Sequence, residues 1–238
     1  MQNIAINTAS WQPANLGWIN RRFENLPPQE ALRYGLVTYG DKIVLASGFG
    51  PSGIVLMHMV SRIRPNTTVF YLQTDLLFPE TMALRDELSR RLGITFTEVH
   101  SGLSLEEQRK GYGPRLWESA PDLCCHLRKV EPLRRYLADK RAWITGIRRD
   151  QSGTRANTPI LGWDSANNLV KVAPLAGWSR DQVWDYLRAH DLPYNRLHDE
   201  GYPSIGCMPC TRAVSGDIAD ERAGRWAGTE KTECGIHL

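Results

Sequence analysis

The chain has 238 residues, of which 42% are hydrophobic and 23% are charged, and its formal net charge is +3. A chain of this length and composition folds as one large domain without disulfides, which excludes disordered, collagen-like and coiled-coil proteins. Its longest apolar run, residues 53–60, is far shorter than the ~20 residues that span a bilayer, and no signal peptide is recognisable. We therefore expect a cytoplasmic protein that binds no membrane and, with so small a net charge, no nucleic acid.

The N-terminal residues 1–35 predict an irregular lead-in with one short helix, because prolines and tryptophans lie among polar residues there. Beyond it, β-branched stretches alternate with helical ones. The predicted strands span residues 42–46, 67–72, 94–99, 142–147 and 169–173, and the predicted helices span 54–63, 79–92 and 181–189. This alternation predicts an α/β fold, a parallel sheet with helices on both faces and ligands at the carboxyl ends of its strands.

The last predicted helix begins at a capping box formed by Ser179 and Gln182 and ends before Pro193. From there to the C-terminus, Gly, Pro, Asp and Arg dominate, and no core periodicity remains. We expect a long loop followed by a flexible tail over residues 215–238. Such a tail can carry a reactive group into and out of a site.

Three glycines, Gly48, Gly50 and Gly53, form the pattern G-x-G-x-x-G between a predicted strand and a predicted helix, and Asp75 follows after the next strand. This spacing fits the fingerprint of dinucleotide-binding proteins. The glycines let backbone N–H groups approach an anion at a helix N-terminus, so the loop indicates an anion site rather than NAD(P) in particular. A site for NAD(P), a site for another nucleotide and an ordinary tight turn all stay open.

Four of the five cysteines form two pairs: Cys124 and Cys125 are adjacent, and Cys207 and Cys210 form C-x-x-C. Adjacent cysteines are hard to fold onto one tetrahedral zinc ion because their side chains point apart, whereas a cuboidal cluster offers them separate irons. One four-iron four-sulfur (4Fe–4S) cluster is therefore the leading interpretation. Structural zinc and unligated buried thiols are the alternatives.

Arginine outnumbers lysine by 23 to 6, which favours forked recognition of oxyanions. Arg148, Arg149 and Arg155 follow the fourth predicted strand, at the sheet edge where an anionic ligand is expected. With Ser152 and Thr154 they can supply bidentate and hydroxyl hydrogen bonds to an oxyanion. The alternative is a solvated loop without a ligand.

The fifth cysteine, Cys234, lies in the predicted tail between Lys231 and His237. Neighbouring cations favour a thiolate, so this residue is a candidate nucleophile that a flexible segment could deliver. A lone terminal cysteine is usually inert, and the residues alone leave both interpretations open.

Five stretches of the chain closely resemble motifs of the assimilatory adenylyl-sulfate (APS) reductases. They are C-C-H-L-R-K-V-E-P-L at 124–133, G-I-R-R-D-Q-S at 146–152, G-Y-P-S-I-G-C-M-P-C-T-R at 201–212, E-R-A-G-R-W at 221–226 and E-C-G-I-H at 233–237. Two cysteine pairs together with E-C-G-x-H resemble the cluster-containing branch, since phosphoadenylyl-sulfate (PAPS) reductases generally keep the terminal cysteine and lack the pairs.

The resemblance implies an adenine-nucleotide α-hydrolase-like fold, with a reductase domain over residues 36–214 and a mobile catalytic tail over 215–238. It implies that the Cys234 thiolate attacks the sulfur of APS and expels AMP, after which thioredoxin or glutaredoxin releases sulfite. It also implies one 4Fe–4S cluster with a structural and electrostatic role, held by Cys124, Cys125, Cys207 and Cys210. The residues that it assigns to the substrate are Ser47, Gly48, Phe49, Gly50, Lys129, Arg148, Arg149, Arg155, Arg222, Arg225 and His237.

Two segments depart from the family pattern. Residues 47–53 read S-G-F-G-P-S-G where the family usually has S-F-x-x-E-D, and residues 72–75 read L-Q-T-D where it has L-D-T-G. The choice between APS, PAPS or both as substrate therefore stays open, and Asp75 would repel a 3′-phosphate if it faced the ribose. A Rossmann-type NAD(P) oxidoreductase and a non-catalytic metal-binding module are the rival functions, and a homo-oligomer is compatible with the sequence.

Overall fold

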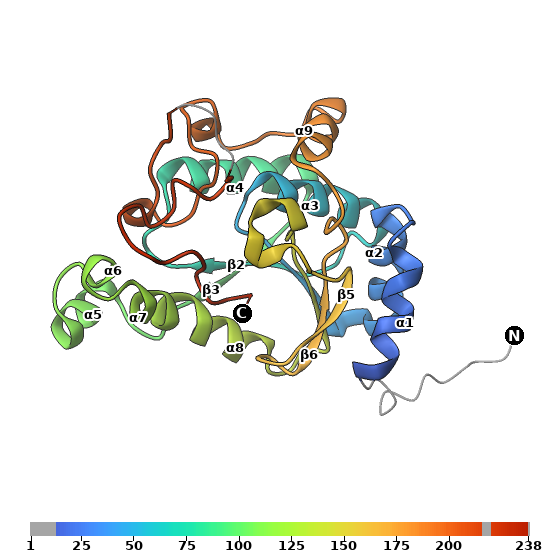
Figure 1. Ribbon diagram of the computed structural model, residues 1–238, viewed down its shortest axis with the longest axis horizontal. Helices are drawn as coiled ribbons and strands as arrows, with labels where there is room; N and C mark the ends of the chain where they lie inside the picture. Colours follow the sequence, from blue (N-terminus) through green and yellow to red (C-terminus); the bar gives the residue numbers. More distant parts are fainter. Residues whose placement is uncertain (1–12, 216–219, 238) are drawn as a thin grey trace, which may run out of the picture.

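The computed structural model describes residues 13–215 and 220–237, and within them lies a six-stranded sheet in the order β3-β2-β1-β4-β6-β5 (Figure 1). The five neighbouring pairs include one antiparallel pair, β5 with β6, and the other pairs are parallel. The strands are β1 Ile43–Ala46, β2 Val69–Gln73, β3 Phe96–His100, β4 Ala142–Ile144, β5 Leu161–Asp164 and β6 Leu169–Val172. The predicted α/β sheet is confirmed, and β5 makes it mixed rather than purely parallel.

Strand β5 is the element that the sequence analysis missed. It is four residues long, and Gly162 interrupts its apolar pattern. A Cβ atom at Gly162 would lie 2.6 Å from the Pro159 ring, so the close approach of that proline requires glycine. The hairpin to β6 is closed by Asp164, whose carboxylate accepts hydrogen bonds from the backbone and side chain of Asn167.

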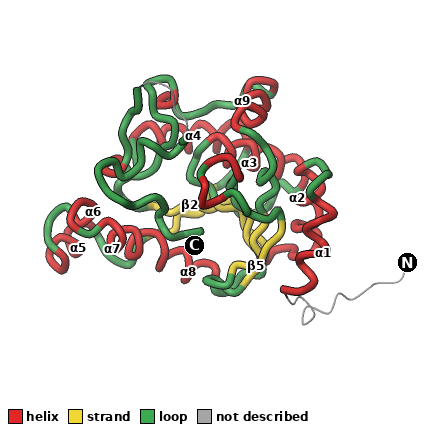
Figure 2. Tube along the Cα trace, viewed as in Figure 1, coloured by secondary structure: helices red, strands yellow, loops and turns green. Residues whose placement is uncertain are grey.

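Four helices cover one face of the sheet: α2 Pro28–Tyr39, α3 Pro51–Ile63, α4 Pro79–Leu92 and α9 Arg180–Ala189. Helix α3 is the most deeply buried of them, because apolar side chains fill almost every position from Ile54 to Val60. The predicted capping box of α9 is present, with Ser179 accepting from the Gln182 N–H. Figure 2 shows helices on both sides of the sheet and loops gathered beyond the ends of the strands.

The opposite face is covered by α8, Glu131–Leu137, and by the end of the chain. A second apolar cluster there joins Phe70 and Trp143 of the sheet to Leu133 of α8, and Ile236 packs against it. The chain end thus lies against the sheet at Ile236 and His237 in this structure. Residues 216–219 and 238 of the predicted tail lie outside the described residues, and the mobility of the tail stays a prediction.

The N-terminal prediction was wrong in part. Two helices, α1 Pro13–Phe23 and α2, occupy the region expected to be irregular, while residues 1–12 lie outside the described residues. Pro27 and Pro28 mark the break between them, since proline cannot continue a helix but fits the first turn of the next one.

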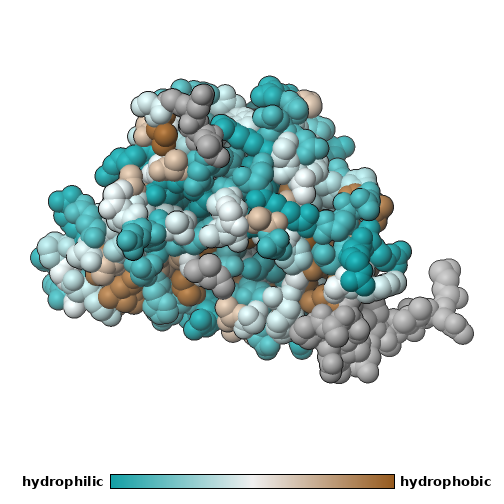
Figure 3. Space-filling view, in the orientation of Figure 1, coloured by the Kyte–Doolittle hydropathy of each residue, from teal (hydrophilic) through white to brown (hydrophobic). Residues whose placement is uncertain are grey.

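Further short helices follow β3 and lead into α8. They are α5 Leu105–Tyr112, α6 Leu116–Ser119 and α7 Pro121–Cys125, and a π-helical segment, His126–Val130, connects α7 to α8. Short 3₁₀ turns span Gly40–Lys42, Arg149–Gln151, Gly153–Arg155, Arg196–His198 and Met208–Cys210. The side of the molecule in Figure 3 is mostly hydrophilic, with hydrophobic side chains in small separate patches. None of the helices formed by residues 13–215 and 220–237 has the length and apolar character needed to cross a membrane.

Candidate active site

A cavity of about 270 Å³ opens at the carboxyl ends of β1, β2 and β4. The strand order reverses between β1 and β4, and such a switch point is where open α/β sheets bind ligands. The loop after β1, the loop after β4, the residues around Cys207 and the end of the chain all contribute to its wall. The cavity thus lies at the edge where the sequence predicts a site, and ligand binding there stays a prediction.

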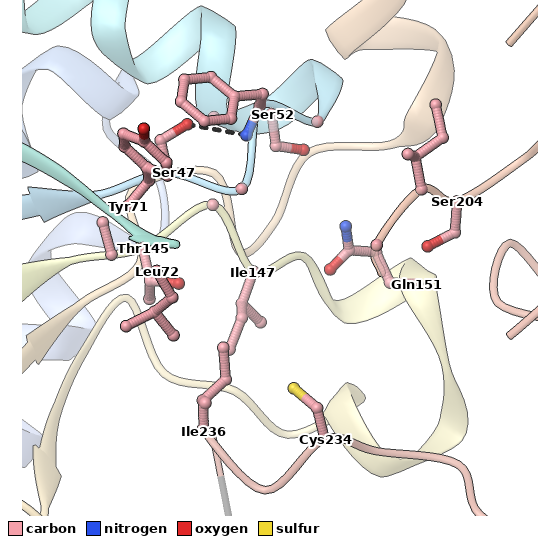
Figure 4. A pocket seen from close by; sticks show the side chains of 18 of the residues that line it. Ser47, Ser52, Tyr71, Leu72, Thr145, Ile147, Gln151, Ser204, Cys234 and Ile236 are labelled. Atoms are coloured by element: carbon pink, nitrogen blue, oxygen red, sulfur yellow. Dashed lines mark hydrogen bonds between the residues drawn. The ribbon is translucent and has the colours of Figure 1, made fainter. Parts of the chain in front are cut away.

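The glycine loop lines the cavity with backbone rather than with large side chains. Ser47 Oγ accepts a hydrogen bond of 3.0 Å from the Phe49 N–H, which is drawn as a dashed line in Figure 4. Phe49 has a positive φ of 59°, and its ring is buried against Tyr71 and Phe96, at centroid distances of 5.1 and 5.3 Å. The Phe49 ring thus anchors the loop, and all four predicted residues of the loop, Ser47, Gly48, Phe49 and Gly50, line the cavity.

Helix α3 begins directly after this loop, at Pro51, and Gly50 provides no side-chain cap. The first-turn N–H groups of a helix carry partial positive charge, so this end of α3 suits an anion. Gly146, after β4, packs on the same turn, where an added Cβ would lie 3.1 Å from Gly53 N. Gly146 begins one of the family motifs, but its role could not be predicted from the sequence, because a close backbone approach between distant segments leaves no local pattern.

Cys234 reaches the cavity from the end of the chain. Its thiol points into the space beside Ile147, Ile236 and Gln151 (Figure 4), and the residue is 9% exposed. It belongs to a small buried cluster with Cys125 and Trp226, against which Cys210 packs. The candidate nucleophile thus lines the same cavity as the glycine loop and lies next to the cysteine pairs.

Glu233 holds the Cys234 segment through two arginines. Arg155 donates to both carboxylate oxygens of Glu233, at 2.8 Å each, and Arg222 lies 3.1 Å from the second oxygen. Burial raises the pKa of Glu233, but the hydrogen bond and the charge of Arg155 lower it by more than burial raises it. The net shift of the pKa is downward. The sequence analysis gave Glu233 no role, and its position next to Cys234 was the signal that could have indicated one.

His237 is fixed by an aromatic stack. Its ring lies 5.3 Å from that of Trp143, nearly parallel at 18°, and Lys171 donates to the His237 carbonyl at 3.4 Å. Trp143 is held in turn by Asp164, which accepts from its indole N–H at 2.9 Å. Burial, together with the nearby charge of Arg155, holds the pKa of His237 well below its usual range, so the imidazole is neutral.

The other predicted cations differ in how free they are. Arg148 is 2% exposed, and its guanidinium donates hydrogen bonds to Ser52, to Asp150 and to both carboxylate oxygens of Glu221. Arg225 also lines the cavity, and its Nε is buried without a hydrogen-bond partner among the described residues. The Arg225 guanidinium lies over the Trp226 ring and donates to Ser204 at 3.5 Å, but it has no carboxylate partner among the described residues. Its charge is therefore available to an anion, whereas the charge of Arg148 is neutralised.

Arg149 is the predicted site residue that the structure does not bring to the cavity. Its guanidinium turns toward α1, where it donates to both carboxylate oxygens of Glu24 and to the Thr158 carbonyl. It is absent from the described lining residues. Two adjacent arginines after a strand point in different directions, and the carboxylate that captures Arg149 lies 125 residues away in sequence.

Lys129 lies between the cysteine pairs and the cavity. Burial lowers its pKa, but the surrounding Cys207, Cys234 and Cys125 raise it more, so the net shift is upward and the amine is charged. Conversely, Lys129 together with Thr74 outweighs the effect of burial and lowers the pKa of Cys207. One cation thus interacts with the candidate nucleophile and with both cysteine pairs.

The two cysteine pairs meet although more than 80 residues separate them in sequence. All five cysteines are free, and Thr74 Oγ1 lies 3.4 Å from Cys207 Sγ. Burial and the neighbouring thiols raise the pKa of Cys124 and of Cys210 to about 11. The thiolate forms of these buried cysteines would repel one another. A bound metal cation would stabilise them, because metal ligands must be deprotonated. No three His, Cys, Asp or Glu side chains among the described residues are arranged to hold a single metal ion.

Asp75 lies outside the cavity wall formed by the described residues. Its carboxylate accepts from Arg128 at 3.1 Å, and Arg128 is 1% exposed and also bonds to Gln108 and the Thr74 carbonyl. Asp75 therefore does not face the cavity. It is not placed to bind a ribose, as in an NAD(P) site, or to repel a 3′-phosphate. Asp75 instead neutralises a buried arginine.

Comparisons with known proteins identify the family of this chain. The profile of the phosphoadenosine phosphosulfate reductase domain matches residues 42–213. An adenosine 5′-phosphosulfate reductase of Salinibacter ruber is 52% identical over 97% of this chain and 92% of its own length. A phosphoadenosine 5′-phosphosulfate reductase of Gloeobacter violaceus is 49% identical over 91% of both chains.

A solved structure shares the fold. The phosphoadenylyl-sulfate (PAPS) reductase of Candida auris, in a phosphate complex, superposes with a TM-score of 0.74 at 30% identity, covering 86% of this chain and 98% of that one. This similarity confirms the adenine-nucleotide α-hydrolase-like fold that the motifs predicted. The chain therefore belongs to the phosphoadenosine phosphosulfate reductase domain family, whose matched members include reductases named for APS and for PAPS.

Proposed function

We propose that this chain reduces APS to sulfite and AMP in sulfate assimilation. The observation that carries the proposal is the Cys234 thiol pointing into a cavity that holds the glycine loop and several cations. A relative 52% identical over nearly the whole chain is named for this activity. A metal-binding module without catalysis would need no thiol in a nucleotide-sized cavity.

In the proposed reaction, the Cys234 thiolate attacks the sulfur of APS. A bond forms between Sγ and that sulfur, the bond from sulfur to the bridging oxygen breaks, and the electron pair leaves on AMP. The enzyme is left with S-sulfocysteine at Cys234. An anion here attacks an anion, so Lys129, Arg222 and Arg225 are the groups that offset the repulsion.

A dithiol reductant completes the cycle. One thiolate of thioredoxin or glutaredoxin attacks Cys234 Sγ, sulfite leaves with the bonding electron pair, and the second thiol resolves the mixed disulfide. Cys234 returns to its thiol form and the reductant becomes a disulfide. This step requires the Cys234 segment to leave the cavity, because the thiol is buried where it lies now.

Cys124, Cys125, Cys207 and Cys210 are the residues that would hold a 4Fe–4S cluster. Their burial, their free thiols and the cations around them fit such a group. The adjacency of Cys124 and Cys125 in the sequence favours separate irons over one zinc ion. When bound, the cluster would supply a structural link between α7 and the Cys207 loop and a fixed charge beside Lys129. Cys207→Ser should lower iron and acid-labile sulfide per chain and the unfolding temperature, whereas unchanged iron content would refute this ligand set.

PAPS is the second candidate substrate, because relatives named for PAPS match nearly as well as those named for APS. Sulfite formation from each substrate, with thioredoxin as reductant, tests the proposal. We expect a higher kcat/KM with APS, because the relative that is 52% identical to this chain is named for APS. Asp75, which is engaged by Arg128, gives no reason to exclude PAPS. Equal rates would establish a dual enzyme, and no sulfite from either would overturn the proposal.

A further inference from the structure

One wall of the cavity carries a hydrogen-bond acceptor that the proposed reaction does not use. His198 lines the cavity from the 3₁₀ turn Arg196–His198. Its Nδ1 lies 2.8 Å from the Tyr202 carbonyl oxygen. A carbonyl can only accept, so Nδ1 carries the proton and Nε2 presents a bare lone pair.

This lone pair has no partner within the part of the chain that the structure describes. His198 Nε2 is buried and makes no hydrogen bond there. Burial also lowers the pKa of His198, which keeps the ring neutral and Nε2 an acceptor near neutral pH. Native proteins rarely leave a buried polar atom unpaired, and an unpaired atom in a cavity wall indicates a ligand that satisfies it.

The His198 ring is held in place. Trp184 of α9, which also lines the cavity, packs edge-on against it with ring centroids 5.4 Å apart. The turn itself is capped by Asn195, which accepts from the Leu197 N–H at 3.1 Å and donates to Thr81 at 3.0 Å. An acceptor fixed in this way can read one donor on a ligand at little entropic cost.

The chemistry of the ligand follows from the contrast with the rest of the wall. The cations that line the cavity near Cys234 only donate, and they match the phosphosulfate oxygens, which only accept. The carboxylates of this region, Glu221 and Glu233, are already paired with arginines. The donors of an adenosine nucleotide are the exocyclic amino group and the ribose hydroxyls, all on the nucleoside.

The position of His198 fits this division. Trp184 packs with the core of the α3 and α9 face, whereas Ile236 packs on the α8 face, so the cavity extends between the two. The sulfur must lie at the Cys234 end, which leaves the nucleoside for the His198 end. We propose that His198 Nε2 accepts a hydrogen bond from the nucleoside of the substrate, either from the adenine amino group or from a ribose hydroxyl, and so contributes to its specificity. This inference rests on the proposed function, because it takes an adenosine nucleotide as the ligand.

The test measures the dissociation constants of AMP and three analogues with the cluster-loaded protein by calorimetry. The analogues are purine riboside 5′-monophosphate, which lacks the amino group, 2′-deoxy-AMP and 3′-deoxy-AMP. His198→Leu removes the acceptor, His198→Gln keeps one, and His190→Leu alters an exposed histidine outside the described cavity lining as a matched control.

We expect His198→Leu to weaken AMP binding about 10- to 100-fold, with partial rescue in His198→Gln and no change in His190→Leu. One analogue should lose a similar factor with the native chain and nothing further with His198→Leu, which identifies the donor. Independent, additive losses for all three analogues, or native affinity in His198→Leu, would overturn the inference. If His198→Leu does not fold, the native chain alone is decisive. Equal affinities of the native chain for AMP and for all three analogues would then overturn the inference. Failure of the native chain to bind AMP would instead contradict the proposed function.

Discussion

The two halves of the cavity are built in different ways. The sheet half, made of the strand ends and the glycine loop, rests on apolar side chains that are almost completely buried, such as Leu45, Ile54 and Ile144. The chain-end half, residues 220–237, has only small apolar contacts, at Trp226 and Ile236. Its last residues are also held by the Glu233 ion pairs and by the stack of His237 on Trp143. A few polar contacts can open at far smaller cost than a packed core.

This difference assigns a task to each half. A rigid sheet half can bind the nucleotide in one position. The ion pairs of Glu233 with Arg155 and Arg222, here called the latch, hold the chain-end half. When the latch forms and opens, Cys234 can reach the substrate and later a reductant. Substitutions in the chain-end half should therefore change turnover and the exposure of Cys234. Nucleotide binding by the sheet half should stay unchanged and serves as the internal reference.

Replacing the nucleophile should have the largest effect. Cys234→Ser should lower sulfite formation at least about 10³-fold, because serine is a far weaker nucleophile than a thiolate. AMP affinity and iron content should stay within about twofold of the native protein, since Cys234 is not expected to be a cluster ligand and the nucleotide would rest on the sheet half. Sulfite formation at the native rate would contradict the assignment.

Removing the charge of Glu233 should weaken the latch. Glu233→Gln leaves Arg155 and Arg222 facing an uncharged side chain, and we expect kcat/KM to fall about 10- to 100-fold. The rate of Cys234 alkylation in the absence of substrate should rise, because the thiol becomes exposed more often. Exposed Glu230 provides the matched control, and Glu230→Gln should change neither quantity. An unchanged alkylation rate in Glu233→Gln would show that the ion pairs do not hold the segment.

The latch should also respond to pH. The pKa of Glu233 lies below its ordinary value of 4.5, so the ion pairs stabilise docking above about pH 4.5, and this contribution is lost as the pH falls through the docked-state pKa. Hydrogen exchange of residues 231–237, corrected for its intrinsic pH dependence, should show lower protection at about pH 3.5 than at about pH 6. The same comparison in Glu233→Gln should be nearly flat, and an equally steep loss there would assign the effect to another group.

The smallest effect is expected from the pair between Lys231 and Asp122. Asp122 is largely exposed, so water screens the pair and its contribution to docking is small. Asp122→Asn should change kcat/KM and Cys234 alkylation by less than about twofold. An effect as large as that of Glu233→Gln would mean that the latch depends on surface charge in general rather than on the buried carboxylate.

The sequence predicted those features that local chemistry determines. The cysteine pairs, the glycine loop, the capping box at Ser179 and five of the strands each have a recognisable local pattern. The short strand β5 does not, because it depends on the packing of Gly162 against Pro159 and on pairing with β6.

The partners of the charged side chains could not be predicted either. Arg149 binds Glu24, Arg128 binds Asp75 and Arg155 binds Glu233, and each pair joins segments that only the folded chain brings together. Sequence reasoning identified the cations near the site but not which of them are neutralised. That distinction separates Arg225, which pairs with no carboxylate among the described residues, from Arg148, which pairs with Asp150 and Glu221.

The central claim, that Cys234 accepts the sulfonate group of APS, is tested most directly by the mass of the intact protein. The cluster-loaded chain is incubated with APS under anaerobic conditions without reductant, and the product is digested and mapped. The account predicts one added SO3 group on the peptide that contains Cys234, released as sulfite when thioredoxin is added. An unmodified Cys234 in protein that binds APS, or a sulfonate on another cysteine, would contradict it.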